Sequence, residues 1–347
     1  MRRHSLARLG LIAALTMLLA VLVAACGDDD DDDTAATDGA GAGEVTEVKI
    51  GTQPWIGYGP FWIADEQGFD EEHGVDIQLV NFSGRQELES GFASERFQAA
   101  NSATNDVIRL ADLGLDYKVT LMEDFSLQAD AIVSCNPEIR SIEDIGTVDG
   151  VNVAFEEFSV SDVLFRYALN EAGVDFDALE YVPAPPSDAG AAVAAGRVDV
   201  AATYEPYLQA ALEEGEDCEV LYTANERPGL ISDVLAVNSQ FAEENPDAIA
   251  GVLRAWGEAI DFYEQSTEEA QAIIAENVGE RPQALSASFE GVRLFGLQES
   301  HDYLEEDYDD LWNDVASILA EQGQIEAEPN VDDYLDTSFG EQALGEE

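Results

Sequence analysis

The amino-acid sequence predicts an α/β protein with largely parallel sheets. From Val48 to about Val237, short apolar runs alternate with helical patterns of about 8 to 15 residues. Turns rich in Gly, Pro and small polar residues separate these segments. From Phe241 to Gln322 the pattern is almost wholly helical. Roughly 320 residues follow the first 25, enough for two domains of ordinary size.

Each expected strand is a short apolar run that ends at a turn signal. The expected strands cover residues 48–51, 75–80, 97–100, 118–122, 129–134, 151–155, 179–182, 198–202 and 235–237. Helices are expected at 61–74, 87–94, 105–113, 141–145, 159–172 and 187–195. Gly173 should end the helix over 159–172, because glycine readily adopts the left-handed conformation of a helix end. The C-terminal helical part is expected to bury the apolar residues Trp256, Ile260, Tyr263, Phe289, Phe295, Leu311 and Trp312.

The first 25 residues have the three-part form of a secretory signal: a basic start, an apolar run and small residues at the end. The apolar run of roughly 17 residues is short for a permanent membrane span. The ending VAAC resembles a bacterial lipobox, in which Cys26 is lipidated and becomes the new N-terminus. An ordinary signal with a coincidental cysteine is the alternative. We therefore expect an extracytoplasmic protein, lipid-anchored to the outer face of the cell membrane.

Residues 26–47 are rich in Asp, Gly, Ala and Thr and predict an acidic flexible tether with a reach of about 25 Å. The whole chain carries a net charge of −58, from 73 acidic and 15 basic residues. Such a surface repels phosphate backbones, which excludes nucleic acid as a partner. Carboxylates in place of lysines over a whole surface suit high salt, where screening is strong, so we expect a salt-adapted source.

Two cysteines, Cys135 and Cys218, remain beyond the lipobox. They could pair in an exported protein, or they could be two unrelated buried thiols. The three histidines are scattered, and no Cys/His cluster has the spacing of a metal site. We expect neither a metal nor a cofactor.

Enzyme signatures are missing from the sequence. It contains no nucleophile elbow, phosphate-binding loop, dinucleotide fingerprint or zinc-protease motif. The acidic pair Glu156-Glu157 could form a glycosidase dyad, but adjacency is expected by chance among 73 acidic residues. A binding protein therefore fits better than an enzyme.

Four polar segments directly follow expected strands, where ligands of open α/β sheets bind. They begin near Thr52, Asn101, Phe155 and Ala202. Gly and Pro residues there allow close backbone approach and start helices, serines can cap a helix, and aromatic rings supply flat walls. The expected ligand-binding residues in and beside these segments are Trp55, Gly57, Tyr58, Asn101, Thr104, Asp106, Asp124, Glu157, Ser159, Tyr204, Glu205 and Asp233.

The same segments carry a family resemblance. WIGYGPFWIADEQGFDEEHGVDIQLV resembles the opening of solute-binding proteins of nitrate/sulfonate/taurine-class ABC importers. The likeness continues in EDFSLQADAIV, GVNVAFEEFSVSDVLF, AAVAAGRVDVAATYEPYL and RPGLISDVLAVNSQFAEENP. It departs from the family at Gln128, where glycine is usual, and near Glu157-Phe158-Ser159, where a Gly-Ser pair is usual.

This resemblance implies a two-lobed periplasmic-binding-protein type II fold, or Venus flytrap, that closes on a solute by a hinge motion. Lobe 1 would comprise residues 48–133 and 235–340, lobe 2 residues 134–234, and the crossings residues 129–134 and 233–237. Both cysteines would then lie in lobe 2, which favours their pairing. The implied partners are a small-molecule solute and the permease and ATPase subunits of the importer, with the binding protein itself a monomer.

The ligand class is less sharply defined. Few Arg or Lys lie in the four segments, whereas several carboxylates and aromatic rings do, which favours a cationic or neutral nitrogenous solute over nitrate. Helix N-termini alone could still hold an anion. A thiamine-pyrimidine-precursor binding protein, a related enzyme on the same fold and a non-transport surface lipoprotein are the alternatives.

Overall fold

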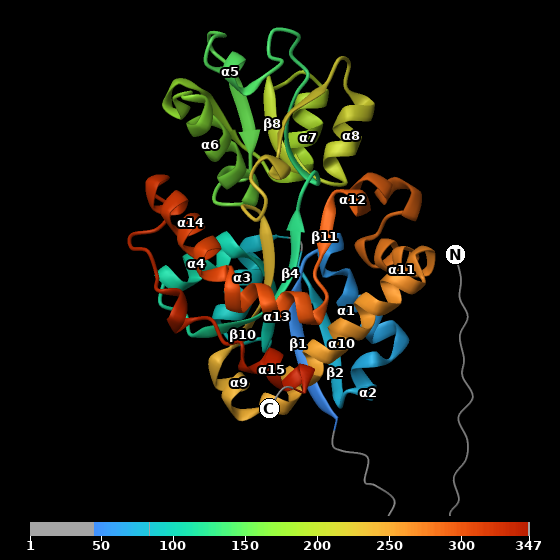
Figure 1. Ribbon diagram of the computed structural model, residues 1–347. Helices are drawn as coiled ribbons and strands as arrows, with labels where there is room; N and C mark the ends of the chain where they lie inside the picture. Colours follow the sequence, from blue (N-terminus) through green and yellow to red (C-terminus); the bar gives the residue numbers. More distant parts are fainter. Residues whose placement is uncertain (1–44, 83, 346–347) are drawn as a thin grey trace, which may run out of the picture. The chain divides into compact units, whose positions relative to one another are not determined.

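The computed structural model describes residues 45–82 and 84–345 of the chain. Residues 43–347 form one compact unit, and within it the chain builds two α/β lobes, each on its own sheet (Figure 1). This confirms the predicted two-lobed fold class. The predicted leader, Cys26 and nearly all of the tether over 26–47 lie outside the described residues.

The first sheet has six strands in the order β11-β4-β10-β3-β1-β2. Its strands are β1 Thr46–Thr52, β2 Val75–Asn81, β3 Ala99–Ala103, β4 Tyr117–Ser126, β10 Ser232–Asn238 and β11 Val292–Leu294. The second sheet has five strands in the order β7-β6-β8-β5-β9. Its strands are β5 Asp130–Ser134, β6 Asn152–Phe155, β7 Glu180–Pro183, β8 Val200–Tyr204 and β9 Glu219–Thr223.

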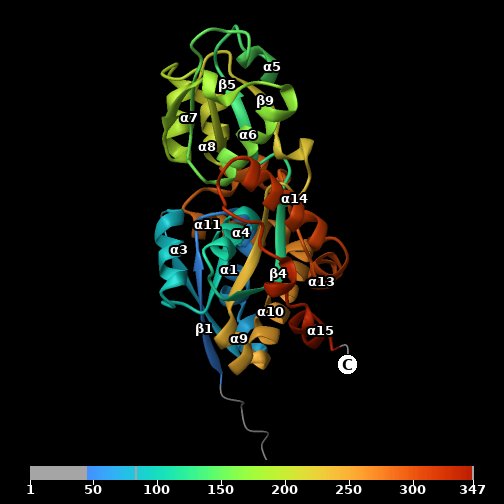
Figure 2. The same cartoon turned by 90° about the vertical axis from the view of Figure 1, so that its left-hand side faces the viewer.

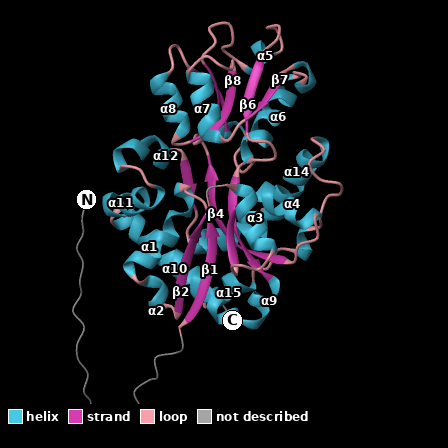
Figure 3. Cartoon of the chain, turned by 180° about the vertical axis from the view of Figure 1, so that it is seen from behind, coloured by secondary structure: helices cyan, strands magenta, loops and turns pink. Residues whose placement is uncertain are grey.

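Helices flank both sheets, as Figure 2 and Figure 3 show from two further sides. In the first half they are α1 Gly59–Gln67, α2 Phe69–Glu72, α3 Arg85–Ala93, α4 Thr104–Asp112, α5 Ile142–Ile145, α6 Val160–Ala172, α7 Pro186–Ala194 and α8 Tyr207–Glu214. In the second half they are α9 Ser239–Glu244, α10 Pro246–Gln265, α11 Thr267–Val278, α12 Ser286–Glu290, α13 Leu297–Glu306, α14 Tyr308–Glu321 and α15 Ser338–Leu344. The short 3₁₀ helices are η1 Ile56–Tyr58, η2 Phe176–Ala178, η3 Ala224–Glu226, η4 Pro282–Leu285 and η5 Val331–Asp333.

Both sheets are mixed, where the sequence predicts largely parallel ones. In the first sheet β1 pairs in parallel with β2 and β3, but β10 runs antiparallel to β3 and β4. In the second sheet β6 pairs in parallel with β7 and β8, but β5 runs antiparallel to β8 and β9. β5 and β10 each enter a sheet directly after the chain crosses between lobes, and the short strand β11 also runs antiparallel to its neighbour β4.

The two crossings are short connections between strands of different sheets. Residues 127–129 join β4 to β5, and residues 224–231 lead from β9 to β10. The sequence places the crossings at 129–134 and 233–237. Residue 129 does lie in the first connection, but residues 130–134 and 233–237 belong to strands β5 and β10. At the first crossing, the backbone N–H groups of Leu127 and Gln128 both donate to the carbonyl of Gly291, at 2.8 and 3.1 Å.

The first sheet is covered on both faces, so its central strands read as continuous apolar runs. Along β10, Val234 and Ala236 face a core shared with α4 and α14, whereas Leu235 and Val237 face a core shared with α1 and α10. In the second core the rings of Trp256 and Phe61 lie tilted against each other with their centroids 4.8 Å apart. The Trp256 indole N–H donates to the Phe295 carbonyl at 2.8 Å.

The aromatic core predicted for the C-terminal helices is confirmed at Trp256, Phe295 and Trp312, which are fully buried. Tyr263, Phe289 and Leu311 are only partly buried at the edges of the cores.

Glycines end several helices in the left-handed conformation. Gly173 ends α6 with φ 68°, which confirms the predicted helix stop. Gly68, with φ 79°, divides the single helix expected over 61–74 into α1 and α2. The three-residue strand β11 interrupts the C-terminal segment expected to be helical, because it pairs with the edge of β4. So short a run carries no periodicity by which a strand could be recognised.

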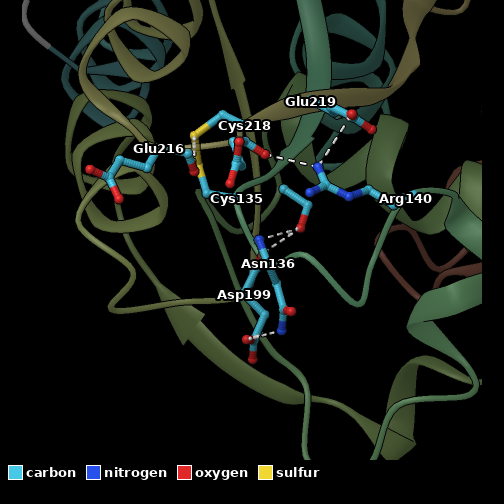
Figure 4. Close-up of a disulfide and its surroundings, with 9 residues drawn as sticks. Cys135, Asn136, Arg140, Asp199, Glu216, Cys218 and Glu219 are labelled. Carbon is cyan, nitrogen blue, oxygen red and sulfur yellow. Dashed lines mark hydrogen bonds and ion pairs between the residues drawn. A yellow bond between two sulfur atoms is a disulfide. The ribbon is translucent and has the colours of Figure 1, made fainter.

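Cys135 and Cys218 form a disulfide in the second lobe (Figure 4). It joins the end of β5 to the start of β9, directly beyond the pair Ser134–Glu219 of their antiparallel ladder. Because β9 is the edge strand, the covalent link holds the strand that has a neighbour on one side only. A β-carbon at Gly215 would overlap both sulfur atoms, so this position requires glycine.

We predict that the double variant Cys135→Ala/Cys218→Ala is less stable than the native protein by about 2–4 kcal/mol, because the bridge closes a chain separation of 83 residues. Urea unfolding at fixed salt measures this difference. A reductant should lower the urea midpoint of the native protein and leave that of the double variant unchanged. Equal midpoints for oxidised and reduced native protein would contradict the prediction.

Candidate functional site

A small cavity lies where the ends of strands from both sheets meet. It has a volume of about 80 Å³. Its lining residues are Gln53, Pro54, Trp55, Tyr58, Arg85, Ala103, Asp106, Asp130, Glu156, Ser159, Val160, Tyr204, Ile231 and Asp233. Most of these residues lie at or just after the carboxyl ends of β1, β2, β3, β6 and β8. The others lie at the starts of β5 and β10. These two strands run antiparallel to their neighbours, so their first residues lie at the same edge as the carboxyl ends of the other strands.

Two aromatic side chains form the wall on the side of the first sheet. The chain turns after β1 into the 3₁₀ helix η1, which places Trp55 and Tyr58 at the cavity. The Trp55 indole N–H donates to Asp124 Oδ2 at 3.1 Å, and the Tyr58 hydroxyl donates to Asp233 Oδ1 at 2.8 Å. A β-carbon at Gly57 would overlap the Asp124 carboxylate and the Trp55 indole nitrogen. Glycine at 57 therefore makes this contact sterically feasible.

The second lobe closes the cavity from the opposite side. Tyr204, the last residue of β8, meets Trp55 edge to face with ring centroids 5.9 Å apart. Ser159 caps α6: its hydroxyl accepts from the Ser161 N–H at 3.1 Å and donates to the Glu156 carbonyl at 2.7 Å. Asp130 begins β5 directly opposite Tyr204 in the ladder.

The turn before Ser159 has an unusual backbone. Phe158 adopts φ 63°, a left-handed conformation that favours glycine, and its side chain is 38% exposed. The Phe158 N–H donates to Asp162 Oδ2 at 2.8 Å, which fixes the turn from inside α6. The departure from the usual Gly-Ser pair noted in the sequence therefore falls on a backbone position suited to glycine.

Besides Asp106, the carboxylates Glu123, Asp124, Asp130 and Asp233 are buried at or behind the cavity. Burial raises the pKa of Asp130 and the pKa of Asp233 to about 7 each. Burial, and after it the charge of Asp233, raises the pKa of Asp124 and of Glu123 well above the usual range. One oxygen of Asp130 and both oxygens of Glu123 have no hydrogen-bond partner within the described part of the chain. These groups hold protons more tightly than free carboxyls do.

An arginine–carboxylate network forms a second wall. Arg85 donates to Glu89 Oε1 at 2.6 Å, and Arg109 donates to the same oxygen at 2.7 Å and to Asp106 Oδ1 at 2.6 Å. Burial opposes the charge of Arg85, but Asp106 and Glu89 outweigh it and raise the Arg85 pKa. Burial raises the Glu156 pKa, and Arg85 opposes that rise.

The structure brings together part of the residue set that the sequence predicts. The predicted residues that line the cavity are Trp55, Tyr58, Asp106, Ser159, Tyr204 and Asp233. Gly57 and Asp124 lie directly behind the Trp55 wall.

The other predicted residues do not line the cavity. Asn101 donates its amide to Thr52 Oγ1 at 3.0 Å and so ties β3 to β1. The hydroxyl of Thr104, at the start of α4, lies 2.7 Å from that of Ser232 at the start of β10. Glu205 accepts from the Gln209 N–H at 3.2 Å in the turn before α8. Glu157 is exposed.

Sequence reasoning passed over the lining residues Arg85, Asp130 and Ile231. Arg85 begins α3 just after β2, so it follows a strand in the same way as the four segments that the sequence singles out. Asp130 and Ile231 reach the cavity through the antiparallel strands β5 and β10, whose direction is not readable from a single chain.

Residues 45–82 and 84–345 contain no group of three or more His, Cys, Asp or Glu side chains placed to hold a metal ion. No helix among them has both the length and the apolar character needed to cross a membrane.

Comparison with known proteins identifies a family and a fold. A sequence profile of the NMT1-like family matches residues 41–278. A Bacillus subtilis (strain 168) protein named for binding aliphatic sulfonates is 23% identical over 308 residues, 87% of this chain and 90% of that relative. An Escherichia coli (strain K12) protein of the same name is 33% identical over 148 residues. That match spans 43% of this chain and 45% of that relative, less than half of each.

Two solved structures share the fold. The periplasmic aliphatic sulphonate binding protein SsuA from Escherichia coli superposes with a TM-score of 0.70 at 21% identity, covering 83% of this chain and 91% of SsuA. The periplasmic nitrate-binding protein NrtA from Synechocystis PCC 6803 gives a TM-score of 0.68 at 19% identity, covering 87% of this chain and 89% of NrtA. These likenesses confirm the periplasmic-binding-protein fold.

We predict that Asp130→Asn raises the melting temperature of the ligand-free protein at pH 8 but hardly at pH 4.5. An aspartate in the unfolded chain titrates near 3.9, whereas burial raises the pKa of Asp130 to about 7. The folded state thus binds the extra proton, and the stability from this group is complete below about pH 4 and lost as the pH rises through 7. Asparagine removes a penalty on the order of 2–4 kcal/mol at pH 8.

Calorimetry at constant salt measures this effect. The matched control is Asp261→Asn on the exposed face of α10, which removes the same charge and should shift the melting temperature equally little at both pH values. A decrease in stability for Asp130→Asn at pH 8 would contradict the prediction.

Proposed function

Since the chain belongs to the NMT1-like family, we propose that it is the extracytoplasmic solute-binding component of an ABC importer. Its ligand in this proposal is a small polar solute that contains nitrogen or sulfur, captured in the interlobe cavity and delivered to the permease. The observation that carries the proposal is the cavity itself, which strand ends from both sheets line and which holds buried charged and aromatic side chains. The relatives named for sulfonate and nitrate binding support it.

Capture would proceed by closure of the two lobes. We propose that the hinge lies in the connections at 127–129 and 224–231, since these segments link the sheets without belonging to either. Trp55 and Tyr204 approach each other from opposite lobes, so a solute between them would contact both lobes at once. The permease would then distinguish closed from open protein by their relative lobe positions.

The lining chemistry supports binding rather than catalysis. Ser159 is the one hydroxyl nucleophile other than tyrosine among the described lining residues, and its hydroxyl is occupied as the cap of α6. Among the described lining residues there is neither a cysteine, which could act as a nucleophile, nor a histidine, which could activate one.

The disulfide supports an extracytoplasmic location, because such bonds persist in oxidising compartments. In the proposal Cys26 carries the lipid, and residues 26–47 tether a mobile, monomeric binding protein near its permease. The permease and the ATPase are the proposed protein partners.

We predict that Trp55→Ala and Tyr204→Ala each weaken solute binding at least tenfold, because each removes one aromatic wall of the cavity. A thermal-shift screen at high salt first identifies a ligand among nitrate, taurine, alkanesulfonates, urea, guanidinium, alkylamines and pyrimidines. Calorimetric titration then compares the variants. Tyr263→Ala is the matched aromatic control and should keep the native affinity, because Tyr263 lines a separate hollow and not this cavity.

Two results would count against this assignment. Failure of every solute to raise the melting temperature would remove the main support for transport. Unchanged affinity in both wall variants would place the binding site elsewhere.

We predict that Cys26→Ser abolishes lipid anchoring in a bacterial host, because the thiol is the atom that receives the lipid. In detergent phase partitioning, the variant should appear in the aqueous phase and the native protein in the detergent phase. Mass spectrometry should show that the N-terminal peptide of the variant lacks the mass of the lipid. Cys135→Ser/Cys218→Ser is the control, since these two cysteines form a disulfide in the folded second lobe and should leave the lipid in place when replaced. A native protein without lipid on its N-terminal peptide would overturn the proposal.

A further inference from the structure

The walls of the cavity carry more negative than positive charge. Asp106, Asp130, Glu156 and Asp233 line it, and Arg85 is the one basic side chain among the described residues that do so. We infer that the cavity selects a small organic cation, recognised through an ammonium or amidinium nitrogen, rather than a sulfonate or nitrate anion. This inference rests on the proposed solute-binding function and names the chemical class of the solute.

Arg85 offers little net charge to an anion. It is bound to Glu89, which also binds Arg109, and Arg109 is bound in turn to Asp106. Glu156 also interacts with Arg85, so the network contains two guanidinium groups and three carboxylates. The network is therefore internally neutralised, and an entering anion would meet a wall without excess positive charge.

The opposite part of the cavity has carboxylates that lack a cation. Asp130 is 2% exposed, and its Oδ1 atom has no partner within the described residues although the side chain lines the cavity. Asp233 is 5% exposed and accepts from the Tyr58 hydroxyl, and neighbouring Asp124 and Trp55 also favour its charged form, but no Arg or Lys among the described residues is paired with it. A buried carboxylate without a compensating group is unfavourable, and a cationic nitrogen with several N–H donors would supply what is missing.

The two carboxylates also come from different lobes. Asp130 belongs to β5 of the second sheet and Asp233 to β10 of the first. Without a cation they oppose each other's ionisation, whereas a cation between them attracts both. A cationic solute would thus favour closure directly, and an anion would not.

The aromatic walls suit the same solute. Trp55, Tyr58 and Tyr204 border the cavity beside these carboxylates. The faces of such rings attract cations, and tryptophan does so most strongly.

Of the helix N-termini beside the cavity, that of α6 is partly occupied, whereas that of α4 has no side-chain cap among the described residues. At the start of α6, Ser159 accepts from the Ser161 N–H, and Asp162 accepts from the Phe158 N–H. The first turn of α4 contains Asp106, whose charge opposes an anion at that helix end.

The inference predicts how the affinity for a solute changes with pH. The groups that face Asp130 and Asp233 from the surrounding elements are Tyr58, Arg85, Asp106, Glu123, Asp124, Glu156, Tyr204 and Glu205. All but Arg85 are acidic or phenolic. Because burial raises the pKa of Asp130 and of Asp233 to about 7, a cation must displace protons below that pH. Affinity for a cation should therefore increase as the pH rises from 5.5 to 8, whereas affinity for an anion should decrease.

Three solutes that differ in their charged groups test the inference: butylammonium, butanesulfonate and 3-aminopropanesulfonate. Titration calorimetry at constant ionic strength should show butylammonium binding at least tenfold tighter than butanesulfonate at pH 8, with the zwitterion between them. Butylammonium binding should release protons, detected as a dependence of the heat on the ionisation enthalpy of the buffer. The Asp130→Asn variant should weaken butylammonium at least tenfold, and the control Asp261→Asn should not.

The outcomes separate the inference from the function on which it rests. If only anions or uncharged solutes from the broader screen bind, or if Asp130→Asn tightens binding, the cation inference is overturned and the solute-binding function stands. If solutes of every charge class fail to bind, the proposed function fails and the inference fails with it. A folded Asp130→Asn variant, verified by its melting transition, makes loss of binding attributable to the carboxylate.

Discussion

A carboxylate removed from water stays charged only where a partner compensates it, and this constraint governs the centre of the molecule. Asp124 and Asp233 are buried at the junction of the two sheets, and the Trp55 indole and the Tyr58 hydroxyl are their hydrogen-bond donors. The two donors stand on either side of Gly57, whose missing side chain leaves room for Asp124. The path of the chain after β1 is therefore fixed by the carboxylates it must satisfy.

The same junction decides where a solute can be held. Strands that end in one lobe and strands that begin after a crossing meet at one place, so groups distant in sequence share one cavity. Asp130 and Asp233 come from different sheets, and so do Trp55 and Tyr204. A binding site divided in this way couples occupancy to the relative position of the lobes, as a hinged binding protein requires.

Family membership defines the fold of this chain, whereas the chemistry of the cavity bears on the solute. The profile match and the solved structures account for the two-lobed architecture. They leave the solute open, because function depends on the groups that line the site rather than on the fold. In this chain those groups are mostly acidic, although the named relatives bind sulfonates or nitrate. The lining is thus a better guide to the solute than the names of the relatives.

The sequence by itself determined the alternation of strands and helices, the glycine that ends α6 and the segments around Trp55, Ser159 and Tyr204, because these depend on local periodicity and turn chemistry. Only the tertiary structure decided that Asp130 and Arg85 join the cavity, whereas Asn101 ties β3 to β1 and Thr104 ties the start of α4 to β10. The direction of β5 and β10 is set by pairing with strands far along the chain. Pairing between strands far apart in the chain does not change the local pattern of apolar and polar residues, so it cannot be predicted from that pattern. The charge of the cavity therefore depends on the arrangement of both sheets.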